Sequence, residues 1–85
     1  MFFVDLLAEC YSAGADDGDA GYAPDFESLW DEVEDRAADE VTEYCDSHAE
    51  KGKILSFNEE MERTREAAQD SYDNGYWNAN EARYA

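Results

Sequence analysis

The sequence predicts an all-α fold, a small three- to four-helix bundle with one long acidic helix. Apolar residues recur at three- and four-residue steps in several segments, as they do on one face of an amphipathic helix. Most of the five glycines and the single proline fall between those segments, where they interrupt the pattern. The 85 residues are enough for one domain, so we expect a single helical domain over residues 1–85.

The first helix is predicted over residues 2–12. Its apolar positions are spaced at helical intervals and comprise Phe2, Phe3, Leu6, Leu7, Cys10 and Tyr11. Residues 13–24 show no periodicity and contain three Gly, three Asp and the single Pro, a composition typical of loops. We therefore expect an acidic loop over residues 13–24.

The longest helix is predicted over residues 25–50. Asp25 directly follows Pro24, and this pair favours a helix start with Asp25 as the N-cap residue. Gly52, which lies between two lysines, is a typical helix stop. The inner stripe of this helix consists of Phe26, Trp30, Val33, Ala37, Val41, Tyr44 and His48.

A third helix is predicted over residues 57–72, because Ser56 and Glu59 have the spacing of a capping box. Its inner stripe consists of Phe57, Met61, Thr64, Ala68 and Tyr72. The segment Asp73-Asn74-Gly75 then predicts a turn, and a short C-terminal helix follows over residues 76–84. An ordered aromatic tail is the alternative for this last segment.

The predicted core is thin and rich in aromatic residues. Leu, Ile, Val and Phe together make 12 of the 85 residues, and Trp, Tyr and Phe together also make 12. Because so few aliphatic side chains give modest stability, a homodimer or a bound partner could complete the core. Cys10 and Cys45 fall on apolar helix faces and nothing marks secretion, so we expect two reduced thiols in a cytoplasmic protein.

The net charge restricts the partners of the protein. Its 23 acidic and 6 basic residues give a net charge of −17, which opposes direct binding to nucleic acid or to an anionic membrane. Residues 1–50 contain 16 acidic residues and one basic residue, whereas residues 51–85 contain seven and five. A basic partner or adaptation to high salt would explain the total, and high salt explains the uneven distribution less well.

One face of the predicted long helix concentrates carboxylates. At about 100° per residue, seven acidic residues fall within an arc of about 120° opposite the apolar stripe. They are Asp31, Glu32, Asp35, Asp39, Glu43, Asp46 and Glu50. Neighbours four residues apart repel each other and lie about 6 Å apart along the axis, similar to successive phosphates of a nucleic-acid strand. Together with a second cluster, these residues form the predicted partner-binding site; the second cluster consists of Asp16, Asp17 and Asp19.

The size, the helical pattern and the Asp31/Asp35/Asp39/Glu43 stripe resemble those of small acidic phage-encoded inhibitors, the anti-CRISPR and anti-restriction DNA mimics. The resemblance covers about residues 16–50. It implies an inhibitor whose acidic helix mimics DNA phosphates and occupies the basic DNA-binding surface of a host protein or nuclease complex. It also implies action in the cytoplasm of the host cell.

Other interpretations of the same residues stay open. The acidic face is also compatible with an ordinary solvated helix surface or with halophilic adaptation. A different function is that of an acidic structural or adaptor protein, which would bind its partner through the aromatic C-terminal half that contains Tyr76 and Trp77.

No catalytic, metal or cofactor site is predicted. Cys45 and His48 lie three residues apart on one helix, where a packed pair is expected, and zinc needs more Cys or His ligands. Residues 70–81 resemble a calcium-binding EF-hand loop, but Tyr72 stands where an oxygen ligand is expected. We therefore expect a protein that has no enzyme activity and needs no metal or cofactor.

Overall fold

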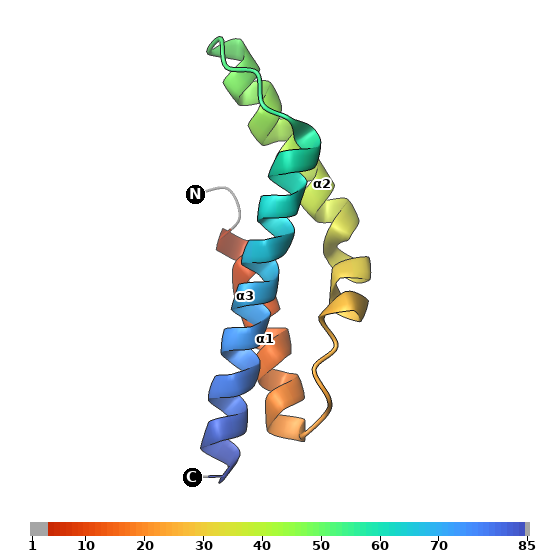
Figure 1. Cartoon of the computed structure of the whole chain (residues 1–85), viewed down its shortest axis with the longest axis vertical. Coiled ribbons are helices and arrows are strands. Elements are labelled where there is room, and N and C mark those ends of the chain that lie inside the picture. Colours follow the sequence, from red (N-terminus) through yellow and green to blue (C-terminus); the bar gives the residue numbers. More distant parts are fainter. Residues whose placement is uncertain (1–3, 85) are drawn as a thin grey trace.

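The computed structural model describes the backbone of residues 4–84 and the side chains of residues 4–82. Regular structure within this range is helical throughout and forms α1 (Val4–Ala20), α2 (Phe26–Glu50) and α3 (Phe57–Tyr84). The all-α class is confirmed. The molecule is elongated, with extents of 51 × 21 × 16 Å (Figure 1). The predicted apolar positions Phe2 and Phe3 lie outside the described residues.

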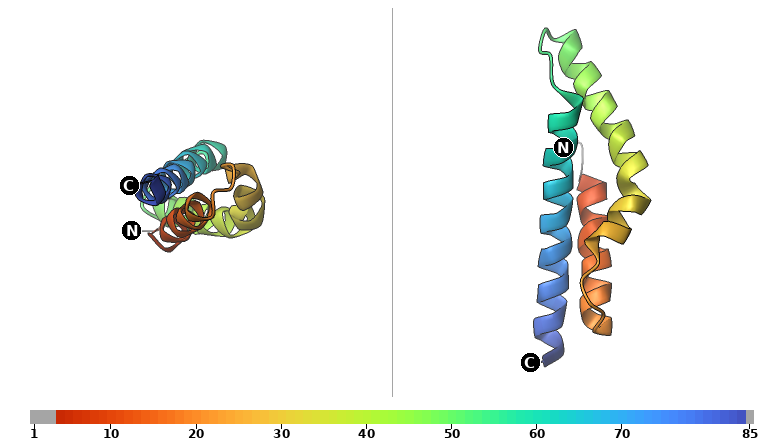
Figure 2. Two further views of the ribbon diagram at one scale, coloured as in Figure 1. Left: turned by 90° about the horizontal axis from the view of Figure 1, so that it is seen from below. Right: turned by 45° about the vertical axis from the view of Figure 1, so that its right-hand side comes forward.

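Helices α1 and α3 run parallel and side by side, while α2 runs in the opposite direction beside them (Figures 1 and 2). The parallel pair depends on glycine. Gly14 of α1 lies against Tyr72 of α3, and Gly18 lies one turn further along, against Tyr76. A Cβ atom on Gly14 would lie 2.8 Å from the carbonyl carbon of Tyr72, so the two backbones approach too closely for any side chain. Gly75 makes the same kind of contact from α3 against α1.

Two predicted interruptions are helical in the structure. The predicted loop over 13–24 is wrong for most of its length, because α1 continues to Ala20 and residues 21–25 alone connect it to α2. The predicted turn at 73–75 is also wrong, so the predicted helices 57–72 and 76–84 are one continuous helix. In both places the glycines allow close packing of two helices, which outweighs the cost of about 1 kcal/mol for glycine within a helix.

The core lies where the inner stripe of α2 meets α1 and α3. Its buried members are Leu6, Cys10, Phe26, Trp30, Val33, Ala37, Ala68, Tyr72 and Tyr76. The ring of Phe26 is central, because its centroid lies 6.0 Å from that of Trp30 and 5.9 Å from that of Tyr72. Such offset and tilted ring pairs are the favourable arrangements for aromatic side chains. A thin core that depends on aromatic residues is therefore present.

The ends of the core depart from the predicted stripes. On α2 the predicted stripe is buried as far as Val41, whereas Tyr44 and His48 are half-buried. On α3 the side chain of Phe57 is 42% exposed, so its predicted core position is wrong. The last turns of α2 and the first turn of α3 lie near the end of the molecule formed by the α2–α3 connection, beyond the reach of α1 (Figure 1).

The helix boundaries follow the capping chemistry of the sequence. Asp25 is the N-cap of α2 and accepts a hydrogen bond of 3.2 Å from the backbone N–H of Ser28. Gly52 follows α2 with a positive φ of 83°, as a C-terminal glycine does. At the start of α3, the Ser56 hydroxyl accepts a hydrogen bond of 3.4 Å from the backbone N–H of Glu59. All three predicted end signals are confirmed.

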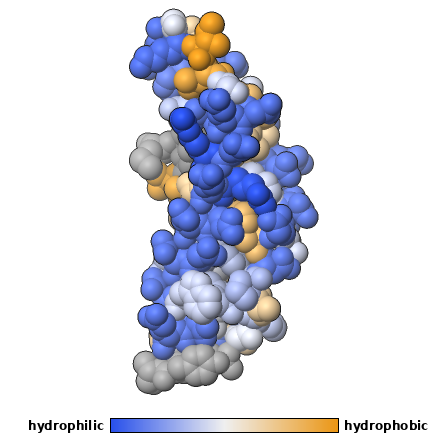
Figure 3. Space-filling model, viewed as in Figure 1, coloured by the Kyte–Doolittle hydropathy of each residue, from blue (hydrophilic) through white to orange (hydrophobic). Residues whose placement is uncertain are grey.

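Hydrophilic residues cover most of the face seen in Figure 3. Hydrophobic residues gather at the end that the α2–α3 connection forms (Figure 3). This connection contains Ile54, which is 95% exposed. Exposed apolar side chains are common on protein surfaces, so the exposure of Ile54 identifies no partner.

Candidate partner-binding surface

The acidic face of α2 is exposed along its whole length. We use this name for Asp31, Glu32, Asp35, Asp39, Glu43, Asp46 and Glu50, all of which are exposed. They lie opposite the buried stripe because the helix turns about 100° per residue. The predicted arc of carboxylates therefore faces solvent, where a partner can reach it.

Arg36, the only Arg or Lys of α2, pairs with an acidic residue of α1 and with no residue of the acidic face. Its guanidinium donates two hydrogen bonds to the Glu9 carboxylate of α1, one of them 3.2 Å long. This pairing lowers the pKa of Glu9 and raises the pKa of Arg36. The other ion pairs among the described side chains are Arg63–Glu60 and Arg65–Glu27. Within that part of the chain, no residue of the acidic face is neutralised by a basic side chain.

The second predicted cluster is divided by the structure. Asp16 and Asp19 are exposed, whereas Asp17 is half-buried and its Oδ2 accepts a hydrogen bond of 2.6 Å from the Tyr72 hydroxyl. All three lie in the last two turns of α1, where the backbone carbonyl groups carry partial negative charge and no basic residue compensates them. Carboxylates at this end of a helix are unfavourable, so local helix stability does not explain their placement.

Tyr72 joins all three helices beside this cluster. Its side chain is fully buried, and its hydroxyl donates to Asp17 while it accepts a hydrogen bond of 3.0 Å from the backbone N–H of Asp25. Burial, together with the hydrogen bond to Asp17, raises the pKa of Tyr72 to about 12. The hydroxyl therefore keeps its proton at neutral pH and remains a donor.

The segment between α1 and α2 is held by a second tyrosine. The Tyr76 hydroxyl donates a hydrogen bond of 2.7 Å to the backbone carbonyl of Tyr22, while the side chain of Tyr22 is 66% exposed. At the end of the segment, hydrogen bonds from the Ser28 hydroxyl and backbone N–H lower the pKa of Asp25. The connection is thus fixed by its backbone, and the ring of Tyr22 is left outside.

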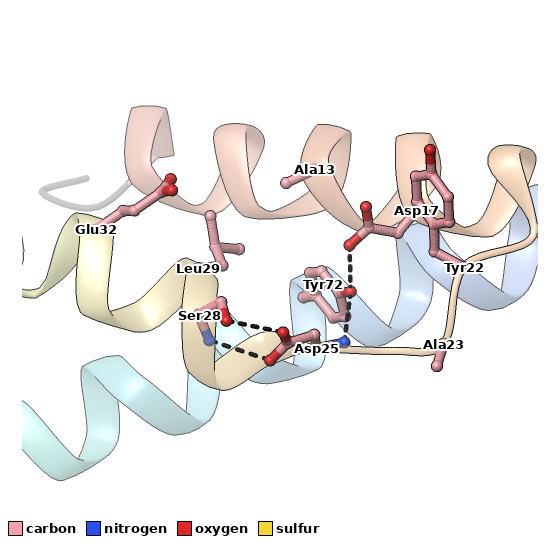
Figure 4. Close-up of a pocket in the computed structure, with 9 residues that line it drawn as sticks. All are labelled: Ala13, Asp17, Tyr22, Ala23, Asp25, Ser28, Leu29, Glu32 and Tyr72. Atoms are coloured by element: carbon pink, nitrogen blue, oxygen red, sulfur yellow. Dashed lines mark hydrogen bonds between the residues drawn. The ribbon is translucent and has the colours of Figure 1, made fainter.

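An open cavity of about 410 Å³ lies between the end of α1, the 21–25 segment and the first turns of α2. It is lined by Ala13, Asp17, Tyr22, Ala23, Asp25, Ser28, Leu29, Glu32 and Tyr72. Figure 4 shows Glu32 at one end, Tyr22 at the other, and Leu29 and Ala13 between them. One member of each predicted acidic cluster, Asp17 and Glu32, therefore lines the same cavity, at separate places along it. Sequence reasoning missed this cavity, and neither Asp16 nor Asp19 lines it.

The aromatic C-terminal half offers less surface than expected. Tyr76 is buried and forms part of the core, so it is not available to a partner. Trp77 is 53% exposed, with its ring edge-on to that of Tyr76 at a centroid distance of 5.0 Å.

The structure also bears on the metal alternative. Residues 70–81 lie within the continuous helix α3, so they do not form the loop that an EF-hand needs. Among the described residues, no group of three or more His, Cys, Asp or Glu side chains could hold a metal ion. His48 and Cys45 are both half-buried, and His48 Nδ1 lies 2.9 Å from the backbone carbonyl oxygen of Tyr44.

Comparison of the chain with protein-family models, curated proteins and solved structures found no match. Over the described residues, none of the helices has an apolar stretch long enough to cross a membrane.

Proposed function

We propose that this protein inhibits a host nucleic-acid-binding defence complex, in the manner of an anti-CRISPR or anti-restriction protein. The acidic face of α2 would occupy the basic surface on which the complex holds DNA, and would take the place of DNA phosphates there. The proposed site of action is the cytoplasm of the host cell. One observation carries the proposal, namely seven exposed carboxylates on one helix face without a basic partner among the described residues.

The row of like charges on the acidic face lowers the stability of the protein, and the fold does not require it. Asp31, Asp35, Asp39 and Glu43 are successive neighbours on the helix, and each like-charged pair of this kind costs a few tenths of a kcal/mol. Interspersed lysines would remove the repulsion and preserve solubility. Features that lower stability without serving the fold are often found where a protein binds its partner.

Electrostatics favours a basic groove as the partner. A line of carboxylates about 6 Å apart gives a field similar to that of a phosphate backbone, and opposite fields accelerate association. A groove that binds DNA through Lys and Arg would therefore attract this helix and lose access to DNA. Such an interaction weakens as salt screens the charges.

The test is inhibition of DNA cleavage by purified CRISPR effector complexes and restriction enzymes. The variant Asp31→Lys/Asp35→Lys/Asp39→Lys should lose inhibition of the sensitive enzyme. The matched control is Glu62→Lys/Glu66→Lys/Asp70→Lys, which makes the same charge change at the same spacing on exposed positions of α3. Circular dichroism establishes that both variants are folded. Equal inhibition by both variants, or a panel in which no enzyme is inhibited, would contradict the proposal.

A second candidate function is an adaptor that binds through the exposed ring of Trp77. Docking of an aromatic ring depends weakly on salt, whereas binding through the acidic face depends on it strongly. The variant Trp77→Ala would abolish partner binding in the adaptor case and leave it unchanged in the inhibitor case.

A further inference from the structure

We infer that the cavity beside the acidic face accepts an arginine side chain from the basic partner. This inference rests on the proposed function, because it names the group with which the partner surface engages the protein. The cavity volume of about 410 Å³ falls within the range of about 300–1,000 Å³ found for ligand sites. It is open to solvent, and its lining includes Glu32 of the acidic face (Figure 4).

The carboxylates of the cavity are not equivalent. Both oxygens of Asp25 accept hydrogen bonds from Ser28, so this carboxylate is occupied in capping α2. Asp17 uses only Oδ2, for the Tyr72 hydroxyl, and Glu32 is exposed without a hydrogen-bond partner among the described residues. Two acceptors from different helices therefore remain, and they lie apart along the cavity (Figure 4).

The remaining lining suits the other parts of an arginine side chain. Leu29 and Ala13 lie between the two carboxylates and offer an apolar surface to the methylene groups (Figure 4). The exposed ring of Tyr22 closes one end, where a planar guanidinium can stack on it. The carbonyl end of α1 adds a negative potential near Asp17. A lysine ammonium would use the charge and would gain less from the ring.

Hydrogen bonds already fix the backbone around the cavity, so an arginine can bind with little rearrangement of the protein. Tyr72 holds Asp17 and the start of α2, and Tyr76 holds the backbone of Tyr22. Because the hydrogen bond from Tyr76 is made to a backbone carbonyl, the ring of Tyr22 can be removed without breaking it. A substitution of Tyr22 therefore tests the contribution of its ring to binding without disturbing the backbone of the connection.

The test is a titration of the intact protein with N-acetyl-arginine methylamide, followed by amide chemical shifts. The matched probe is the citrulline derivative, which has nearly the same shape but no charge. Arginine should shift the amides of Tyr22, Ser28 and Leu29, and citrulline should not. Tyr22→Ala should weaken arginine binding about two- to fivefold, the size expected for a cation–π contact at an exposed site. Glu32→Gln, which removes a carboxylate at the opposite end of the cavity from Tyr22, should weaken it by a smaller factor, whereas Glu66→Gln on α3 should leave it unchanged.

Equal shifts from citrulline, or shifts spread evenly along α2, would overturn the inference. The experiments distinguish an error in the arginine-binding inference from an error in the proposed function. If inhibition is lost on reversal of Asp31, Asp35 and Asp39 but arginine does not bind at the cavity, the cavity assignment is wrong and the inhibitor stands. If arginine binds at the cavity but no nuclease is inhibited, the proposed function is wrong.

Discussion

The hydroxyl of Tyr72 donates a hydrogen bond of 2.6 Å to Oδ2 of Asp17, and thereby joins the middle of α3 to the last turns of α1. The hydroxyl oxygen of Tyr72 also accepts a hydrogen bond from the backbone N–H of Asp25 at the start of α2. One buried atom therefore sets where the α2 helix begins relative to the α1–α3 pair. The position of the acidic face and the shape of the cavity both depend on this arrangement.

Tyr72→Phe should destabilise the protein by about 1–3 kcal/mol, because it leaves two polar partners without their hydrogen bond and changes the packing little. The free energy of unfolding in urea measures the effect. Tyr11→Phe is the control, since its hydroxyl accepts an exposed hydrogen bond from Asn78 and should contribute less than about 0.5 kcal/mol. A loss of the same size in both variants would show that Tyr72 has no special role.

The raised pKa of Tyr72 predicts a loss of stability at alkaline pH. An unfolded tyrosine titrates near pH 10, whereas burial and the hydrogen bond to Asp17 raise the pKa of Tyr72 to about 12. The folded state holds the proton more tightly, so this contribution is complete below about pH 10 and is lost as the pH rises through about 12. Urea unfolding of wild type and Tyr72→Phe should converge in that range. A constant difference between the two proteins up to about pH 12 would contradict this assignment.

Gly75→Ala should destabilise the protein, although alanine is the better helix former by about 1 kcal/mol. The added methyl group would overlap the backbone of α1 at Tyr11, so the two helices must separate. We expect a loss greater than about 3 kcal/mol, measured by thermal unfolding. Asn74→Ala, at the exposed neighbouring position, should raise the melting temperature slightly. Stabilisation by Gly75→Ala would mean that α1 and α3 do not approach closely.

The sequence predicts much of this fold where local chemistry decides the outcome. The stripe from Phe26 to Val41 and the end signals at Asp25, Gly52 and Ser56 are all found in the structure. Local rules fail where a glycine is used for contact between distant helices. A glycine that allows close packing has the same sequence signal as one that ends a helix, so the partner helix must be known first.

Of the candidate partner-binding surface, too, one part can be predicted from the sequence and another part cannot. Exposure of the acidic face follows from helical periodicity, and it was predictable. The cavity is not predictable from the sequence. Its lining residues Asp17, Tyr22 and Glu32 belong to three segments, and only the tertiary fold places these around one space. The placement of Asp17 beside this cavity depends on the continuation of α1 through residues 13–20, where the sequence pattern predicts a loop.

Asp35→Lys should stabilise the fold and weaken partner binding at the same time. In the native protein, Asp35 is repelled by Asp31 and Asp39, one turn away on either side. A lysine there would replace two repulsions with two attractions, each worth about 0.2–0.5 kcal/mol, for a total gain of about 0.8–2 kcal/mol. Thermal unfolding at low salt measures this gain, which should shrink as salt screens the charges. Glu66→Lys on α3 is the control of equal charge change, and it should not impair inhibition. If Asp35→Lys raises the melting temperature without reducing inhibition, the acidic face serves solubility and not binding.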